Sequence, residues 1–316
     1  MSLFKYSEVY SPKYLSLLEI AGTHERIHWT KEEVKLQDDV EQFKRGRITD
    51  DQKQFIKSIL RLFTESDKNV AQGYLDVLMP LYKNNDARMM LMSFAAREAI
   101  HQTAYALLND TLGYGDDFYY EFKDWAEMKE KSDFMLFEFN SGDKIKDGIM
   151  FLAKQTLIEG ISLFASFVML LNFDRSGLLP GMVDVNKWSI KDEGMHVSGN
   201  SELFKLSLKE KPQYVNDDFK KDIYDTAREL VRLEDAFIDT CFQNREISNL
   251  KAQDVKDYIR YIADIRLTQL GLKANWGITK NPLPWVDMLV GKTEASFFER
   301  AVIEYSKGNL TGEWVY

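Results

Sequence analysis

Two Glu-x-x-His pairs, Glu98 with His101 and Glu193 with His196, use half of the four histidines in the chain. Each pair lies in a segment whose apolar residues repeat at helical spacing, and positions three apart share one face of a helix. Each pair can therefore point a carboxylate oxygen and an imidazole nitrogen at one metal ion. Two such pairs facing each other would hold two ions.

Two further acids lie in neighbouring predicted helices. Glu159 stands in the most apolar segment of the chain, whereas Asp67 lies in the polar run Thr64–Asn69 and could equally be an exposed acid. One acid from each of two helices, with Glu-x-x-His from each of two others, is the ligand set of di-iron and di-manganese bundles. Four carboxylates also neutralise two divalent cations, which makes a buried site tolerable.

A third pair at the same spacing, Glu25 with His28, shows that the spacing alone is weak evidence. It lies in the polar stretch AGTHERIHW, where we expect no surrounding apolar helix, so we interpret it as a solvated pair. His24 with His28 is interpreted as structural. The predicted metal ligands are therefore Asp67, Glu98, His101, Glu159, Glu193 and His196.

The composition excludes several classes of protein. The net charge is −9 and no block of Lys or Arg is present, so the basic surface of a nucleic-acid-binding protein is not expected. Cys241 is the only cysteine, which excludes an internal disulfide, a cysteine zinc site and dithiol chemistry within one chain. The N-terminal stretch lacks the apolar core of a signal peptide, so we predict a cytoplasmic protein.

The strongest candidate for a membrane span is the segment 148–173, whose second half is almost wholly apolar. It carries Lys154, Gln155 and Glu159, and an unpartnered carboxylate at mid-span would be costly in lipid. We therefore expect the central helix of a soluble bundle and no membrane association.

Only six prolines and seventeen glycines interrupt the chain, and the segments between them have helical periodicity. The sequence predicts an all-α fold in a single domain over 1–316, with an N-terminal arm over 1–48 and a C-terminal tail from about 290 to 316. Helices are expected at about 49–80, 85–109, 116–131, 144–173, from 180 through the second Glu-x-x-His pair, 216–242 and 252–276.

In these residues the chain resembles the small, radical-generating subunit of class I ribonucleotide reductase. In that family a ligand acid precedes the first Glu-x-x-His by about thirty residues, as Asp67 precedes Glu98 here. A tyrosine follows four residues after the histidine, as Tyr105 follows His101. Asp192 stands directly before the second pair, which is similar to the family's Asp-Glu-x-x-His.

The resemblance extends over nearly the whole chain. Trp29 in HWTKEEVKLQDDV is similar to the family's N-terminal tryptophan, and NPLPW at 281–285 is similar to its C-terminal landmark. Ferritin-like storage proteins lack this tryptophan, the tail and the placement of the tyrosine.

The resemblance implies a ferritin-like helical bundle that forms a homodimer and holds two metal ions, iron first and manganese as the alternative. It implies that the oxidised cofactor generates a stable tyrosyl radical, here assigned to Tyr105. A separate large catalytic subunit, docked through the C-terminal tail, would use this radical to reduce ribonucleoside diphosphates to deoxyribonucleotides. The small subunit would then be an oxidoreductase subunit that is active only with its partner.

The resemblance also implies a relay that carries the radical toward that partner. It would pass through His101, Asp192, Trp29 and a tyrosine of the tail. Tyr305, which follows FFERAVIE, is assigned to the tail position in preference to Tyr316.

Two other functions would use the same ligands. A stand-alone dimetal oxidase or desaturase would turn over a small or fatty substrate beside the site, and a storage protein would assemble into a shell. Dependence on an added large subunit separates a reductase subunit from the oxidase, and metal counting separates it from the store. The ligand set accepts both iron and manganese, so the metal stays open.

Overall fold

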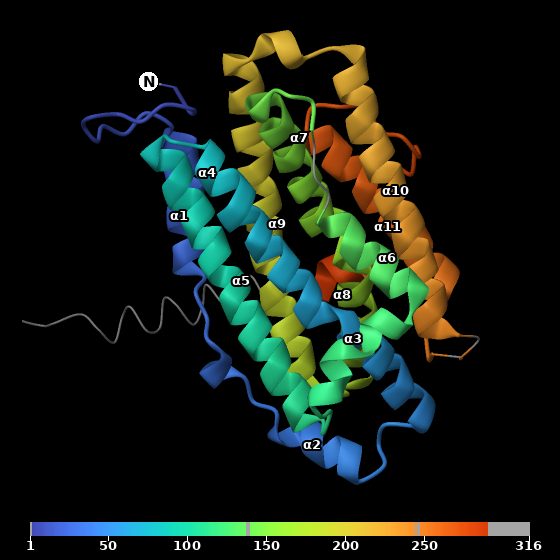
Figure 1. Ribbon diagram of the computed structural model, residues 1–316. Coiled ribbons are helices and arrows are strands. Elements are labelled where there is room, and N and C mark those ends of the chain that lie inside the picture. The colour runs from blue at the N-terminus through green and yellow to red at the C-terminus, as the bar shows by residue number, and fades with distance from the viewer. Residues whose placement is uncertain (1, 137–139, 244, 246, 290–316) are drawn as a thin grey trace, which may run out of the picture.

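The computed structural model of the chain describes residues 2–136, 140–243, 245 and 247–289. Long helices run side by side in an elongated bundle (Figure 1). Within the described residues the only β pairing is an isolated bridge between Ile247 and Leu250. The predicted all-α fold is confirmed, whereas Tyr305, Tyr316 and the predicted tail lie outside the described residues.

Four segments supply the predicted metal ligands, and they pack against one another in the core. These are α3 (Asp50–Gln72), α5 (Asn85–Thr111), α7 (Lys144–Leu157) with its continuation α8 (Phe164–Leu171), and α9 (Pro180–Glu210). Outside them, α6 (Ala126–Met135), α10 (Asp217–Phe242) and α11 (Ala252–Gln269) cover the side formed by α3, α7 and α8.

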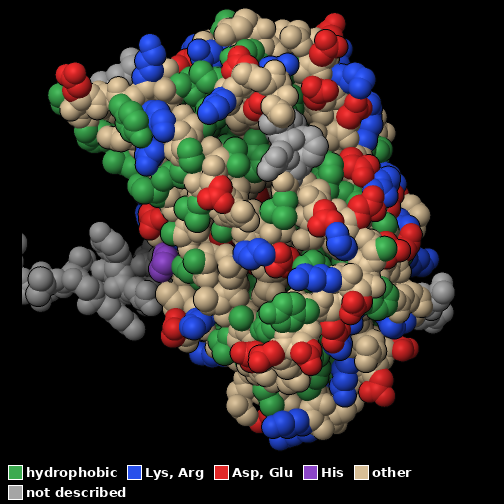
Figure 2. Space-filling model, viewed as in Figure 1, with side chains coloured by type: hydrophobic (Ala, Val, Ile, Leu, Met, Phe, Trp, Pro, Cys, Tyr) green, Lys and Arg blue, Asp and Glu red, His purple; other side chains and the backbone are tan. Residues whose placement is uncertain are grey.

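The most apolar helical run, Lys144–Ser176, is long enough to cross a membrane, but its apolar window is completely buried inside the protein. It is therefore a core helix, as predicted from Glu159. The face of the molecule in Figure 2 intersperses acidic and basic side chains, as expected for a solvated bundle.

Two π-helical turns interrupt the predicted helices. The residues Ile158–Ser162, which include Glu159, form one turn between α7 and α8. The residues Gly73–Leu78 form the other, between α3 and the short helix α4 (Met79–Leu81). Such turns are rare in proteins, and many of those known lie at functional sites. The extra residue redirects the side chains around it.

The predicted last helix is too long, since α11 ends at Gln269 rather than near residue 276. Gly271 has a φ of +83°, which a helix interior does not allow. Asp264 then holds the returning chain, because its Oδ1 accepts hydrogen bonds from the backbone N–H groups of Asn275 at 2.6 Å and Trp276 at 2.9 Å.

The expectation that no helix surrounds the stretch AGTHERIHW is wrong. The N-terminal arm contains α1 (Leu15–Arg26), and α2 (Gln37–Lys44) follows it. Leu17, Ala21 and His24 are buried on one face of α1, which packs against α5 and α9. Only three buried side chains make this face, so polar neighbours hide its periodicity in the sequence.

The start of α9 is capped from a distant helix. Leu179 at its N-cap has a φ of 53° and makes no side-chain cap. Instead Asp39 of α2 accepts hydrogen bonds from the backbone N–H groups of Gly181 at 2.9 Å and Met182 at 2.7 Å. A carboxylate at a helix N-terminus satisfies free N–H groups and the helix dipole. Asp39 thus sets the position of the helix that carries the second Glu-x-x-His pair.

Candidate metal centre

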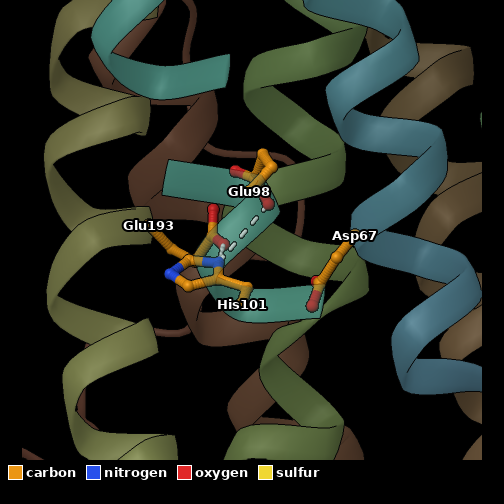
Figure 3. Close-up of side chains that lie close together, drawn as sticks. All are labelled: Asp67, Glu98, His101 and Glu193. Carbon is orange, nitrogen blue, oxygen red and sulfur yellow. Dashed lines mark ion pairs between the residues drawn. The ribbon is translucent and has the colours of Figure 1, made fainter. Parts of the chain in front are cut away.

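All six predicted ligands meet in the core, and each of them is fully buried. Asp67, Glu98, His101 and Glu193 bring potential ligand atoms within 4.8 Å of one another, and Figure 3 shows their side chains converging from three helices. Glu159, Glu193 and His196 form a second such group. Asp67, which could have been an exposed acid, therefore points into the core.

The two carboxylates of the Glu-x-x-His pairs lie between the two histidines. His101 Nδ1 is 3.4 Å from Glu98 Oε2 and 3.3 Å from Glu193 Oε1. His196 Nδ1 is 3.0 Å from Glu98 Oε1 and 3.3 Å from Glu193 Oε2. Each carboxylate thus presents one oxygen to each half of the site, so both carboxylates would help to hold two ions. Asp67 lies on the His101 side, and Glu159 lies on the His196 side.

The donor set fits metal ions. The carboxylate oxygens of Asp67, Glu98 and Glu193 and the Nδ1 atoms of both histidines are buried and make no hydrogen bond within the described protein. A buried polar atom without a partner costs about 1–3 kcal/mol, so such atoms rarely gather in one place without a ligand. Oxygen and imidazole donors without a thiolate suit iron or manganese.

The electrostatics of the cluster lead to the same conclusion. Burial raises the pKa of Asp67 and that of Glu159 well above the ordinary values. Burial alone would lower the pKa of His101, but the charge of Glu98 and contacts with Asp192 and Glu193 raise it well above its ordinary value. Four acids in a dry core require positive charge, and two divalent cations would balance them.

Glu159 differs from the other acids, because hydrogen bonds hold both its oxygens. Tyr74 donates to Oε2 at 2.8 Å and Gln155 Nε2 donates to Oε1 at 2.6 Å. Asn200 Nδ2 in turn donates to the Tyr74 hydroxyl at 2.7 Å. The two π-helical turns therefore meet at this contact. Sequence analysis missed these three partners, although Gln155 lies one helical turn before Glu159 and could have been found.

Three of the four residues predicted for the relay, His101, Asp192 and Trp29, lie together, whereas the fourth, Tyr305, lies outside the described residues. Asp192 Oδ2 accepts a hydrogen bond from Trp29 Nε1 at 2.7 Å and lies 3.1 Å from His101 Nε2. The Trp29 and His101 rings stack with their centroids 5.8 Å apart. Arg97, which sequence analysis missed, donates to Asp192 Oδ1 at 2.7 Å. Burial opposes ionisation, but contacts with His101 and the charge of Arg97 lower the pKa of Asp192 to about 2.

Tyr105 is fully buried one helical turn beyond His101. Its hydroxyl donates a long hydrogen bond of 3.4 Å to Ser189 Oγ, and its ring packs on Phe63 with centroids 4.2 Å apart. Burial, followed by the charge of Asp67, raises the pKa of Tyr105 well above its ordinary value. The side chain is therefore a neutral phenol shielded from water, beside the Asp67 half of the site.

The two histidines outside the Glu-x-x-His pairs, His24 and His28, lie in different environments. His28 and Glu25 are exposed, and neither belongs to a group of potential metal ligands among the described residues, which agrees with a solvated pair. His24 is instead completely buried, with its Nε2 atom 3.2 Å from His196 Nε2. Sequence analysis gave His24 no contact with the site, since only the packing of α1 on α9 brings the two rings together.

The fold and the site together define a ferritin-like protein with a dimetal carboxylate centre. Residues 7–282 match the family model described as ribonucleotide reductase, small chain. The chain belongs to this family.

Relatives and solved structures agree with this assignment. A probable ribonucleoside-diphosphate reductase small subunit of Invertebrate iridescent virus 3 is 39% identical over 310 residues, covering 92% of this chain and 82% of that protein. The ribonucleoside-diphosphate reductase subunit beta of Chlamydia pneumoniae is 26% identical over 298 residues, covering 90% of this chain and 86% of that protein.

Two solved structures share the fold at lower identity. The ribonucleotide reductase R2 subunit from Clostridium botulinum has a TM-score of 0.80 at 20% identity, covering 88% of this chain and 89% of that one. Dimanganese(II)-NrdF of Streptococcus sanguinis has a TM-score of 0.77 at 15% identity, covering 90% and 99%. The predicted family and fold are confirmed, and a ribonucleotide reductase subunit is favoured over a stand-alone oxidase or desaturase.

Proposed function

We propose that the chain generates and stores a tyrosyl radical and passes it to a large catalytic subunit, which reduces ribonucleotides to deoxyribonucleotides. The observation that carries the proposal is the placement of Glu98 and Glu193 between His101 and His196, with buried oxygens that make no hydrogen bond to any described residue. Together with Asp67 and Glu159, these residues would hold two metal ions.

A phenol is difficult to oxidise, and two bound iron or manganese ions would supply the oxidising power. Tyr105 is the proposed radical site, because it lies on the helix of His101 and is sealed in the core. Its neutral phenol would give one electron to the bound ions and its proton toward the Asp67 half of the site. The contact with Phe63 and the long hydrogen bond to Ser189 would leave the radical shielded from water and reductants.

The proposed relay leaves the site through Asp192. This carboxylate would hold the Nε2 proton of His101 and thereby keep its Nδ1 atom free for metal. The same oxygen accepts from Trp29, so an unbroken set of hydrogen bonds links a metal ligand to the indole. Beyond Trp29 the proposed route passes to Tyr305 of the tail and then to the partner.

A solved structure that shares the fold, the ribonucleotide reductase Rnr4 of Saccharomyces cerevisiae, is a homodimer. We propose that this chain also forms a homodimer and works with a large subunit. For this chain we propose that the tail from about residue 290 to 316 docks on the large subunit, where rigid aromatic side chains suit a docking anchor. Removing residues 311–316 should abolish turnover with the large subunit and leave two metal ions per chain. Turnover by the truncated protein at low partner concentration would contradict docking through the tail.

Iron is the metal we propose, with manganese as the alternative, because the donors accept either. Metal analysis of protein from its native source, combined with paramagnetic resonance, distinguishes the two. A protein whose radical forms only with manganese would overturn the choice of iron.

The decisive variant is Tyr105→Phe, which removes only the phenolic oxygen. We expect it to bind two metal ions per chain, to show no tyrosyl radical by electron paramagnetic resonance, and to lose turnover with the large subunit. Tyr82→Phe is a matched control, since Tyr82 is also fully buried but bonds Ser207 at 2.8 Å outside the metal site. A tyrosyl radical of normal yield in Tyr105→Phe would show that another residue carries it.

A further inference from the structure

The two histidines of the site are supported by different groups at the nitrogen that points away from the carboxylates. His101 Nε2 lies 3.1 Å from Asp192 Oδ2, so a carboxylate supports it. His196 Nε2 lies 3.2 Å from His24 Nε2, so a second imidazole supports it. Both supporting residues are completely buried.

His24 is itself held by a short series of hydrogen bonds that leads to the surface. Its Nδ1 atom lies 2.6 Å from Ser93 Oγ, and the Ser93 hydroxyl donates to Glu25 Oε1 at 2.5 Å. Ser93 is partly buried and Glu25 is exposed. The His24 ring also packs edge-on against Phe94, with centroids 5.1 Å apart.

These contacts determine where each proton lies. His196 Nδ1 faces Glu98 and Glu193, so the form that binds metal carries its proton on Nε2. His24 Nε2 must then accept this proton's hydrogen bond, and its own proton lies on Nδ1. That proton is donated to Ser93, which donates in turn to Glu25. This is the only placement of the protons in which every donor of the series has an acceptor.

His24 is suited to act as this neutral acceptor. Its Nε2 atom faces His196 and its Nδ1 atom faces Ser93, so both ring nitrogens of the neutral imidazole have a partner. Its backbone is also held, because Arg97 Nη2 donates to the His24 carbonyl oxygen at 3.2 Å. The lone pair on Nε2 is therefore kept in place and directed at His196.

We propose that His24 is a positioning residue for the metal centre, which fixes the tautomer and ring orientation of His196 and so sets the affinity of one of the two ions. The proposal rests on the proposed function, in that it takes His196 as a metal ligand. Partners of this kind change metal affinity by about 10–100-fold when they are removed from a ligating histidine. Asp192 Oδ1 also lies 3.7 Å from His24 Nε2, but the Oδ2 atom that faces His101 is held by Trp29. The effect of His24 should therefore fall mainly on the His196 half.

The test is a titration of the full-length chain with Mn²⁺ alone, with free Mn²⁺ measured by electron paramagnetic resonance. His24→Leu fills the space but removes the acceptor, so the affinity for one ion should fall by about 10–100-fold while the other changes little. His24→Gln offers an amide oxygen to His196 and an amide N–H to Ser93, so it should restore the affinity to within about threefold. This rescue separates hydrogen bonding from a role in packing.

Ser93→Ala is a second variant that leaves the imidazole in place and removes the acceptor of its Nδ1 proton. It should weaken the same ion by a smaller factor, and it serves the test if His24→Leu does not fold. Equal weakening of both ions in His24→Leu, no weakening at all, or failure of His24→Gln to rescue would overturn the role of His24. Binding of fewer than two ions by the unmodified chain would instead contradict the proposed ligand set.

Discussion

Asp192→Asn is the substitution that most directly tests how the site is supported. The carboxylate of Asp192 is completely buried, and each of its two oxygens accepts a hydrogen bond from a side chain. Its Oδ2 atom accepts from Trp29 at 2.7 Å and lies 3.1 Å from His101 Nε2. Its Oδ1 atom accepts from the guanidinium of Arg97, which is only 2% exposed.

The asparagine keeps the size of the side chain but removes the charge and one acceptor. Breaking a buried ion pair by removing one partner costs about 3–5 kcal/mol, because the remaining charge stays in the core. Arg97 would be that charge, since Asp192 is its paired acid at 2.7 Å. We therefore expect the free energy of unfolding of the metal-free protein to fall by about 3–5 kcal/mol. His101 also loses its carboxylate partner, so metal affinity on that side should fall by about 10–100-fold.

Urea unfolding followed by circular dichroism, at one protein concentration for all variants, measures the change in stability. Glu41→Gln is the matched control, because Glu41 pairs with exposed Arg45 at 3.0 Å on the surface of the protein. Such exposed pairs contribute about 0–1 kcal/mol. If Asp192→Asn destabilises the protein no more than Glu41→Gln does, the reasoning that Asp192 neutralises a buried charge is refuted.

Two further predictions concern acids outside the metal cluster. Burial raises the pKa of Glu234, which pairs with Lys131 at 2.5 Å, from 4.5 to about 7. The folded protein then binds more protons than the unfolded chain between these values, so the stability advantage of wild type over Glu234→Gln should shrink by about 2.4 kcal/mol as the pH rises from 5 to 7.5. A pH-independent difference in urea unfolding would contradict this shift. Asp39→Ala removes the distant cap of α9 and should lower the free energy of unfolding by about 1–2 kcal/mol. The control Asp38→Ala, at an exposed neighbouring residue, should change the free energy of unfolding by less than about 0.5 kcal/mol. Equal effects of these two substitutions would exclude the cap.

The sequence by itself determined the parts of this protein that depend on local geometry. Glu98 with His101 and Glu193 with His196 could be recognised because helical spacing places residues three apart on one face. The long apolar run around Glu159 predicted a core helix, since a buried acid requires a partner. The bounds of α5 and α10 followed from caps and periodicity within the same segments. Each of these inferences uses residues within one continuous segment of the chain.

Apart from Asp192 and Trp29, which the family resemblance predicts beside His101, only the tertiary structure decided what surrounds the ligands. His24 contacts His196 across 172 positions of the chain, and Arg97 contacts Asp192 across 95. Tyr74 reaches Glu159 across 85 positions, through two π-helical turns that periodicity cannot detect. Such contacts depend on how helices pack, and no pattern within one helix specifies its neighbour. The chain's own sequence therefore specifies the ligands, while the packing of its helices specifies the hydrogen bonds that hold them.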